Sequence, residues 1–372
     1  MLVFEKVGLP NKRMQDGDIG IEVEVEGRNL PRAVDGYRVE RDGSLKAEES
    51  LEYVFKKPHN LVGARKMLLK LEESYQEHNT RVDDSVRAGV HVHINVQQLT
   101  TLELFTMMVV YVTLEDLLLK FCGTHREGNL FCLRSRDAEW VLFALEEAAR
   151  HDNLHKLHSD HLRYSSMNVK ALAEYGSLEF RAMRGTRDLK LIGDWAEILL
   201  TIRDNSKGFN NPAEVMEVYS NFQVDHFMDR TLGKWAPTFR NYPQYEAVVM
   251  GGMRRAQMVA YATDWEHFDQ EVPAPHMDEE ELANWVRVCL RPGDRFVKVV
   301  ERQVCVEVLT LDGESVLRWH EDEQLHDRPA NAAPKPGGVE FKWPGMRAGV
   351  EVDGHQVILD DLVENEEDEE DY

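Results

Sequence analysis

The stretch that decides the fold is residues 18–27, which read DIGIEVEVEG. Apolar side chains alternate without a break with glycine and glutamate, and a period of two is typical of a β-strand with one buried face. The other face carries Glu22, Glu24 and Glu26. Because glutamate is a poor strand former, local propensity does not explain its use three times. Taken alone, the strand is equally consistent with a solvated sheet face and with a row of oxygen ligands for divalent cations.

The composition is that of a globular protein with an acidic surface. Of its 372 residues, 42% are hydrophobic and 30% are charged, which is typical of soluble domains. The formal net charge of −23 argues against non-specific binding of nucleic acid or anionic membranes, which requires a basic surface. No apolar run approaches the roughly 20 residues of a membrane helix. With no signal-peptide pattern and four cysteines that form no CxxC pair, we expect a cytoplasmic protein with reduced thiols.

Other segments alternate in the same way as residues 18–27. They are residues 51–58 and 89–96, followed by a predicted strand pair at 163–169 and 177–183. Their polar faces carry Glu52, His91, His93, Asn95, Glu179 and Arg181. Alternation over most strands favours an antiparallel sheet with one covered and one open face over a doubly wound parallel sheet.

Between these strands the apolar residues have the spacing that is typical of helices. The predicted helices span residues 61–77, 102–121, 137–150 and 188–203. Thr100 or Thr101 is a suitable N-cap for the second helix, and Gly123 follows its end. The fold class expected is therefore α+β, with helices grouped on one face of the sheet.

The chain is expected to have four parts. A catalytic core would span residues 1–208, followed by a helical region at 209–292, and together the later parts would form a C-terminal α/β extension. A small β-rich region is predicted at 293–360, with strands at 296–308 and 315–320 and a hairpin at 350–359. Residues 361–372 are so acidic that we expect a disordered tail. The histidine-rich segment 151–161 is interpreted as a loop, because polar residues flank it.

The polar strand faces gather carboxylates, imidazoles and a guanidinium. Like charges on neighbouring strands repel by roughly a few tenths to 1 kcal/mol per pair. Mg²⁺ and Mn²⁺ would reverse that sign, because both prefer carboxylate oxygen and imidazole suits Mn²⁺. Arg181 supplies a planar fork suited to phosphate oxygens. Since no GxxxxGK[ST], GxGxxG or HExxH motif is present, the pattern predicts metal-assisted phosphoryl transfer from a nucleotide outside the P-loop, Rossmann and zincin classes.

Taken in order, these motifs resemble the amidoligase family. This family belongs to the carboxylate–amine ligase superfamily, which includes glutamine synthetase and glutamate–cysteine ligase. The resemblance covers roughly residues 18–205. It rests on GIEVE at 20–24, DGS at 42–44, EYVFKKP at 52–58, GVHVHI at 89–94, Asn168, and LEFR at 178–181 followed by Gly185 and Thr186.

The resemblance implies a funnel-like antiparallel sheet with a glutamine-synthetase-like core. ATP would enter one end of the funnel and the substrates the other. The implied reaction is formation of an amide (peptide-like or isopeptide) bond: ATP phosphorylates a carboxylate, and an amine attacks the acyl phosphate to give the amide, ADP and phosphate. The expected partners are a small-molecule or peptide carboxylate and an amine donor, with no nucleic acid or membrane. The oligomeric state is left open.

The same resemblance implies roles for particular residues. Mg²⁺ or Mn²⁺ would be held by Glu22, Glu24, Glu52, Glu179 and His93, and His91 would contact the nucleotide, although which of the two histidines is the metal ligand stays open. Arg181 and Arg184 would neutralise charge on the γ-phosphoryl group. Asn168 and Arg163 would line the substrate or nucleotide pocket, and Asp42 would orient or deprotonate the amine. Glu26 receives no role.

Two other functions fit the same face. One is a kinase that phosphorylates a carboxylate or a guanidino group without forming an amide. The other is a non-enzymatic structural or assembly protein that retains the fold and binds through its C-terminal region and acidic tail.

Overall fold

The computed structural model describes most of the N-terminal part of the chain. Side chains are described within residues 2–9, 17–41, 43, 45–123, 126–218, 220–221 and 223–265, and between 295 and 358 the backbone of the strands is described. Asp42, the segments 266–294 and 322–338, and the acidic residues 361–372 lie outside the described residues. The chain divides into two compact units, Met1–Gln270 and Glu271–Tyr372.

The first unit is built on a seven-stranded antiparallel sheet. Its strands are β1 (Ile19–Arg28), β2 (Tyr37–Glu40), β3 (Ser50–Phe55), β4 (Arg81–Val82), β5 (Gly89–Asn95), β6 (Met167–Asn168) and β7 (Ser177–Arg184). They lie in the order β2-β3-β1-β5-β7-β6, and β4 pairs with the end of β1. The α+β class and the antiparallel sheet predicted from alternation are therefore confirmed.

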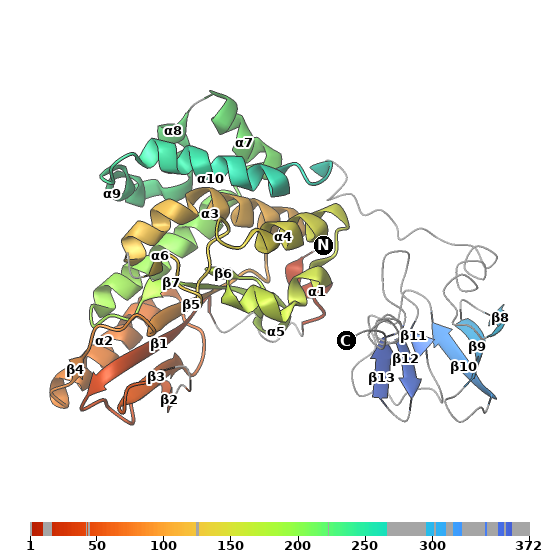
Figure 1. Ribbon diagram of the computed structural model, residues 1–372, viewed down its shortest axis with the longest axis horizontal. Coiled ribbons are helices and arrows are strands. Elements are labelled where there is room, and N and C mark those ends of the chain that lie inside the picture. Colours follow the sequence, from red (N-terminus) through yellow and green to blue (C-terminus); the bar gives the residue numbers. More distant parts are fainter. Residues whose placement is uncertain are drawn as a thin grey trace, which may run out of the picture. The chain divides into compact units, whose positions relative to one another are not determined.

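Helices cover one face of this sheet, where α2 (Leu61–Glu77), α3 (Thr101–Cys122) and α6 (Leu189–Ser206) pack (Figure 1). Together with α4 (Glu139–Arg150), they confirm the helices predicted before residue 208. The Thr100 hydroxyl accepts a hydrogen bond from the backbone N–H of Glu103, and the Glu103 carboxylate accepts one from the backbone N–H of Thr100. Gly123 closes α3 at a φ of 107°, a backbone angle that glycine tolerates best.

Further helices complete the first unit. They are α1 (Val3–Lys6), α5 (Ala171–Tyr175), α7 (Pro212–Asn221), α8 (Val224–Leu232), α9 (Ala236–Arg240) and α10 (Tyr245–Ala260). Of these, α7 and α10 pack against α3 in the same compact unit. The boundary predicted at residue 208 stays a sequence-based prediction.

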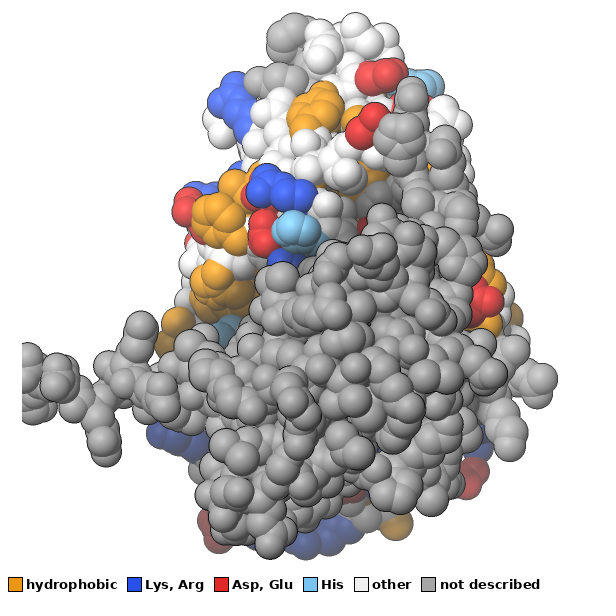
Figure 2. All heavy atoms as spheres, turned by 90° about the vertical axis from the view of Figure 1, so that its right-hand side faces the viewer, with side chains coloured by type: hydrophobic (Ala, Val, Ile, Leu, Met, Phe, Trp, Pro, Cys, Tyr) orange, Lys and Arg blue, Asp and Glu red, His pale blue; other side chains and the backbone are white. Residues whose placement is uncertain are grey.

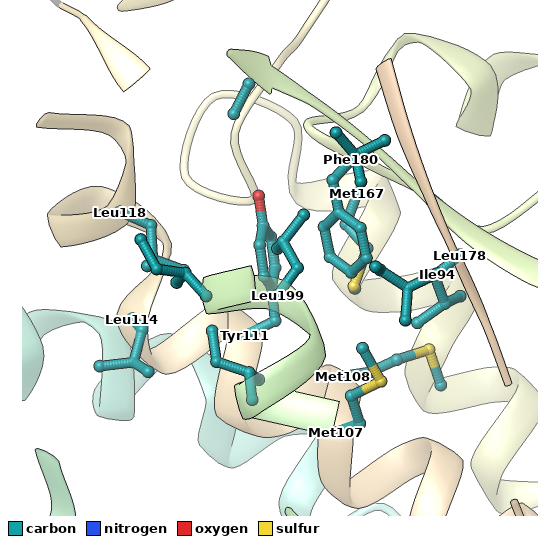
Figure 3. Packing of buried hydrophobic residues seen from close by; sticks show 14 of the residues in the cluster. Ile94, Met107, Met108, Tyr111, Leu114, Leu118, Met167, Leu178, Phe180 and Leu199 are labelled. Atoms are coloured by element: carbon teal, nitrogen blue, oxygen red, sulfur yellow. The ribbon is translucent and has the colours of Figure 1, made fainter. Parts of the chain in front are cut away.

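The core lies between the sheet and α3. Tyr111 of α3 packs against Phe180 of β7 with ring centroids 4.8 Å apart, and Leu114 of α3 and Ile94 of β5 belong to the same fully buried cluster (Figure 3). Because α3 is covered by the sheet on one side and by α6, α7 and α10 on others, it is apolar around most of its circumference, as buried helices are. This packing leaves the opposite sheet face open.

The strand predicted at 163–169 is much shorter than expected. Only Met167–Asn168 forms β6, and Asp160–Tyr164 is a 3₁₀ helix. The Ser165 hydroxyl donates a hydrogen bond of 2.6 Å to the Leu162 carbonyl oxygen, and such local serine bonds compete with strand pairing. The segment between the two predicted strands contains α5, which Gly176 closes at a φ of 66°.

The second unit contains two small antiparallel sheets. The first has the order β10-β9-β8, from β8 (Arg295–Val300), β9 (Gln303–Leu309) and β10 (Ser315–Glu321), so the predicted strand at 296–308 is in fact two. The second is formed by β11 (Val339–Glu340), β12 (Gly349–Val352) and β13 (His355–Ile358). The β12–β13 pair confirms the hairpin predicted at 350–359.

The described surface is mixed in character. Hydrophobic side chains lie in small groups beside charged ones and histidines on the face in Figure 2. Within the described residues, no helix is both long and apolar enough to cross a membrane.

Neighbouring glycines of α10 give a test of the α3–α10 packing. A Cβ at Gly252 would lie 2.0 Å from the Thr113 carbonyl oxygen of α3, whereas one at Gly251 would have its nearest neighbour, Arg255 Nη1, 3.9 Å away. We expect Gly252→Ala to destabilise the protein by about 1–3 kcal/mol through overpacking. Gly251→Ala should instead stabilise it by about 0.5–1 kcal/mol, as alanine does inside helices. Urea unfolding of both variants measures this, and equal effects would contradict the close approach.

A buried carboxyl ties α3 to the segment before β6. Glu115 accepts hydrogen bonds from the Ser135 amide, at 2.8 Å, and from the hydroxyls of Ser135 and Ser166. Burial raises the pKa of Glu115 above its ordinary value of 4.5, although these hydrogen bonds oppose the change. The folded state therefore binds this proton more tightly than the unfolded chain does.

This shift predicts a pH dependence of stability. The contribution of Glu115 is complete below the unfolded pKa and is lost as pH rises through the folded pKa, so stability should fall over that window. In Glu115→Gln the loss should be absent, because the amide does not titrate. The free energy of unfolding of both proteins, measured in urea from pH 4 to 8, tests this. Parallel pH profiles would show that Glu115 has an ordinary pKa.

Candidate active site

The open face of the sheet brings the predicted carboxylates and histidines together through strand register. Glu22 of β1 lies directly opposite His91 of β5, and His93 lies opposite Glu179 of β7. On the other side of β1, Glu24 lies opposite Glu52 of β3. Each position follows from alternation, because all these residues have the parity that points away from the core.

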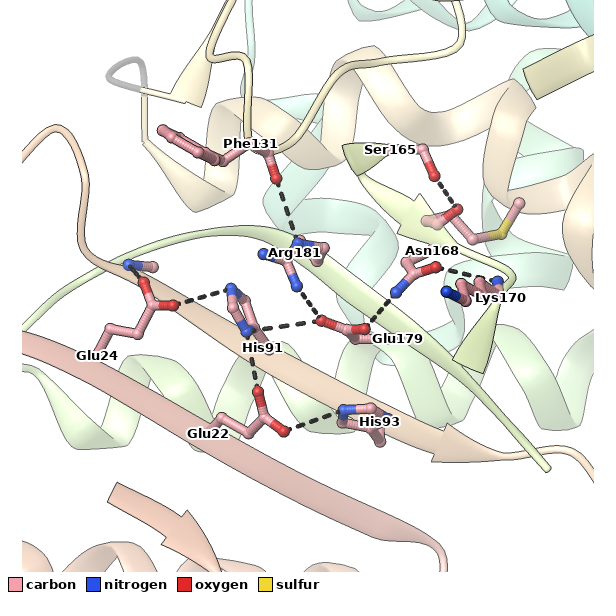
Figure 4. Close-up of polar contacts among 12 residues, drawn as sticks. Glu22, Glu24, His91, His93, Phe131, Ser165, Asn168, Lys170, Glu179 and Arg181 are labelled. Atoms are coloured by element: carbon pink, nitrogen blue, oxygen red, sulfur yellow. Dashed lines mark hydrogen bonds and ion pairs between the residues drawn. The ribbon is translucent and has the colours of Figure 1, made fainter. Parts of the chain in front are cut away.

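His91 lies at the centre of this group, between three carboxylates (Figure 4). Its Nδ1 lies 3.0 Å from Glu22 Oε2 and 3.6 Å from Glu179 Oε1, and its Nε2 lies 3.5 Å from Glu24 Oε1. His93 Nε2 lies 3.5 Å from Glu22 Oε1. Because Glu22 reaches both imidazoles, it joins the two histidines into one cluster.

Glu179 joins this cluster to the β6 edge. It accepts hydrogen bonds from Asn168 Nδ2 and Arg181 Nη1, both at 2.5 Å. Arg181 also donates through Nε to the Phe131 carbonyl oxygen at 3.2 Å.

Val90 pairs with Met183 and Val92 with Phe180, so the single residue His91 faces two residues of β7. This is the pattern of a β-bulge, which re-aims side chains next to functional sites.

The electrostatics follow from burial and mutual contact. Burial alone would raise the pKa of Glu22, but its hydrogen bonds and charge interactions with His91 and His93 hold that pKa far below the ordinary value. Burial likewise opposes the change at Glu179, whose pKa is lowered by His91, Arg181 and His93. The pKa of His93 is raised despite its burial, mainly by Glu22 and Glu179. The carboxylates are thus held ionised although they are largely removed from water.

The donor set fits divalent cations. One ligand atom from each of Glu22, His93 and Glu179 lies within 4.8 Å of the other two, and the same holds for Glu22, Glu52 and His91. Among the described residues these are the groups of three or more such side chains, and the histidine-rich segment 151–161 forms none. Carboxylate oxygen with imidazole nitrogen is a set that suits Mn²⁺ and Mg²⁺.

A cavity of about 570 Å³ opens above these residues. Its floor is acidic, and its wall is basic, formed by Arg41, Arg87, Arg126, Arg163, Lys170 and Arg181. A second cavity of about 390 Å³ meets the first at Glu22, His93 and Tyr175. Val54, Phe55 and Pro58 give the second cavity apolar walls, and Lys56 and Lys57 border it.

Some residues predicted for the site lie elsewhere or are not described. Arg184 does not line either cavity, and its Nη1 donates to the Cys122 carbonyl oxygen at the end of α3. Asp42 lies outside the described residues, although Arg41 and Gly43 on either side of it line the larger cavity. Glu26, which received no role, accepts hydrogen bonds from the amides of Lys46 and Ala47.

The sequence did not single out several residues that border the cavities. They are Arg41, Arg87, Arg126, Phe131, Lys170, Glu174 and Tyr175. These side chains come from loops, from strand flanks or from the short helix α5, where no alternating pattern predicts which way a side chain points. Their Arg and Lys side chains gather around acidic residues of the sheet only in the folded protein, so the sequence gives no sign of this group.

Comparison with known families agrees with this geometry. A family profile described as "Putative amidoligase enzyme" matches residues 58–202. The matched segment contains His91, His93, Asn168, Glu179 and Arg181, whereas the strand with Glu22 and Glu24 precedes it. No curated protein matches the chain. The profile confirms the amidoligase resemblance seen in the motifs.

The cluster predicts that Mn²⁺ binds through Glu22. Glu22 takes part in both candidate ligand groups, so Glu22→Gln should weaken Mn²⁺ binding at least about tenfold. Substitution even of residues that only hydrogen-bond to a metal ligand lowers metal affinity about 10–100-fold. Glu26→Gln is the matched control, because Glu26 lies on the same strand and face but bonds to backbone amides. Titration calorimetry with MnCl₂ compares the three proteins. Equal affinities would show that this face is an ordinary polar surface.

Proposed function

We propose that the protein is an ATP- and Mg²⁺-dependent carboxylate–amine ligase, because a family profile described as "Putative amidoligase enzyme" matches residues 58–202. The family indicates an enzyme that forms amide bonds. The observation that carries the proposal is the pairing of an acidic, histidine-containing floor with a basic wall in one cavity. This arrangement suits a complex of divalent cations and phosphate oxygens.

Glu22, Glu52, His91, His93 and Glu179 would hold Mg²⁺ or Mn²⁺, with Glu24 beside them. The bound ions would neutralise charge on the transferred phosphoryl group and on the carboxylate floor. Glu24 Oε2 already accepts a hydrogen bond of 2.7 Å from the Gly89 amide. That contact fixes its carboxylate next to His91 and supports a positioning role.

The reaction we propose has two balanced steps. A substrate carboxylate oxygen attacks the γ-phosphorus of ATP, forming an acyl phosphate while ADP leaves. The amine nitrogen then attacks the acyl carbon, the amide forms, phosphate leaves and the amine loses a proton. Arg181 would bind oxygens of the transferred phosphoryl group through its guanidinium, since its Nη1 lies at the cluster beside Glu179. Asp42 is the residue we propose to orient or deprotonate the amine.

The two cavities support a division of labour. We assign the nucleotide base to the smaller cavity, because its apolar walls suit a flat heterocycle and Lys56 and Lys57 suit phosphates. The carboxylate substrate and the amine would occupy the larger, basic cavity, which includes Arg163 and Asn168. Glu22 and His93 border both, so phosphoryl transfer would take place between them. In this proposal the two cavities would correspond to the two ends of the funnel expected for the family.

Calorimetric titration with ATP and Mg²⁺ tests the proposal. Wild type should release binding heat, and Glu22→Ala and Glu179→Ala should each lose it, because both side chains would contact the metal. Glu26→Ala is the control and should keep it. No heat with wild type, or equal heat in all variants, would instead favour a binding protein that retains the fold.

A product assay separates the ligase from a kinase. With a carboxylate and an amine present, a ligase should release ADP and phosphate and should form amide in equal amounts. Accumulation of a stable phosphorylated product without any amine would assign the site to a kinase instead.

A further inference from the structure

The larger cavity contains a buried arginine with an unusual lack of partners. Arg126 is only 2% exposed, yet its Nε and Nη1 have no hydrogen-bond partner among the described residues. Its Nη2 donates to the Arg181 carbonyl oxygen at 2.8 Å. A guanidinium carries five N–H donors and is always charged, so most of its capacity is unused.

An unpaired charge in this position is unfavourable for the folded protein. Buried charges are normally paired, because removal from water without compensation is costly. The guanidinium donates to a neutral carbonyl, and Arg181, which provides that carbonyl, is itself a cation. Arg126 therefore adds positive charge to the cavity wall without a described counterion.

The surrounding chain holds Arg126 in place. Its amide donates to the Gly123 carbonyl oxygen, and its own carbonyl oxygen accepts from the Asn129 amide and from the Cys132 thiol. Gly89 lies under the guanidinium, where a Cβ would be 3.0 Å from Arg126 Nη2. The side chain is thus fixed in the wall of the cavity and lies against β5 and the β7 bulge.

We propose that Arg126 binds an oxyanion, a carboxylate or a phosphoryl group, in the larger cavity. Nε and Nη1 both carry N–H donors that lack a partner among the described residues, and oxyanions accept such charge-assisted hydrogen bonds. If the ligase assignment is correct, this oxyanion belongs to the substrate or to the group transferred, and Arg126 selects for it. The existence of the anion site does not depend on the ligase assignment, because it rests on the burial and the missing partners of Arg126.

Anion titration of the full chain tests this inference. Inorganic phosphate and succinate serve as separate probes, without nucleotide or divalent cation, and binding is followed by calorimetry and by the melting temperature. Wild type should bind at least one probe and melt at higher temperature with it. Arg126→Met should weaken that binding at least about tenfold, and Arg126→Lys should fall between, because it keeps the charge and loses the guanidinium N–H donors. Whichever probe binds identifies the oxyanion as phosphoryl or carboxylate.

A second readout separates a binding role from a structural one. In buffer without these anions, Arg126→Met should melt at or above the wild-type temperature, because it removes an uncompensated buried charge. Arg255→Met is the matched control. Arg255 is partly buried but pairs with Asp116 at 2.6 Å and lines neither cavity, so this variant should melt lower and keep the anion response.

Two results would overturn the inference. One is an absence of anion binding by wild type, and the other is an anion response in Arg126→Met equal to that of wild type. Failure of the ligase proposal is distinguishable, since it would appear as missing heat with ATP and Mg²⁺ while the anion titrations remain unaffected.

Discussion

The main physical constraint on this structure is the concentration of like charge on the open face of one sheet. Glu24 and Glu52 lie directly opposite each other on neighbouring strands, and Glu22 and Glu179 both contact His91. Such an arrangement lowers stability unless cations offset it. His91, His93 and Arg181 offset it in part from within the chain. The remaining negative charge on a largely buried floor makes a divalent cation the natural complement.

Apolar burial on the covered face of the sheet offsets the unfavourable free energy of this charge cluster. Ile21, Val23 and Val25 of β1 are fully buried beneath the glutamates, and α3 packs against the sheet with an apolar surface. Strand register is fixed by that core, because a slip of one residue would put the carboxylates inside. The apolar side of each strand thus determines which acids meet on the other side. Stability and site geometry come from the same alternation.

Alternation explains how much could be predicted from the sequence. It correctly gave the strands that carry Glu22, Glu52, His91 and Glu179, because a period of two assigns faces without knowledge of strand order. It could not give the pairing of Glu22 with His91, which needs the order β3-β1-β5-β7. Arg126 was out of reach as well, because it lies in a turn after α3, where no periodicity predicts side-chain direction. The strand predicted at 163–169 was too long, because local hydrogen bonds of the Ser165 hydroxyl compete with strand pairing.

The bulge in β7 links these observations to the proposed chemistry. It sets two residues of β7 against His91, and the carbonyl of one of them, Arg181, accepts the bond from Arg126. The Arg181 guanidinium meanwhile shares Glu179 with Asn168. In the proposed reaction Glu179 would help to hold the metal while Arg181 would bind phosphoryl oxygens. The contact between these two side chains would then link the acidic floor to the basic wall.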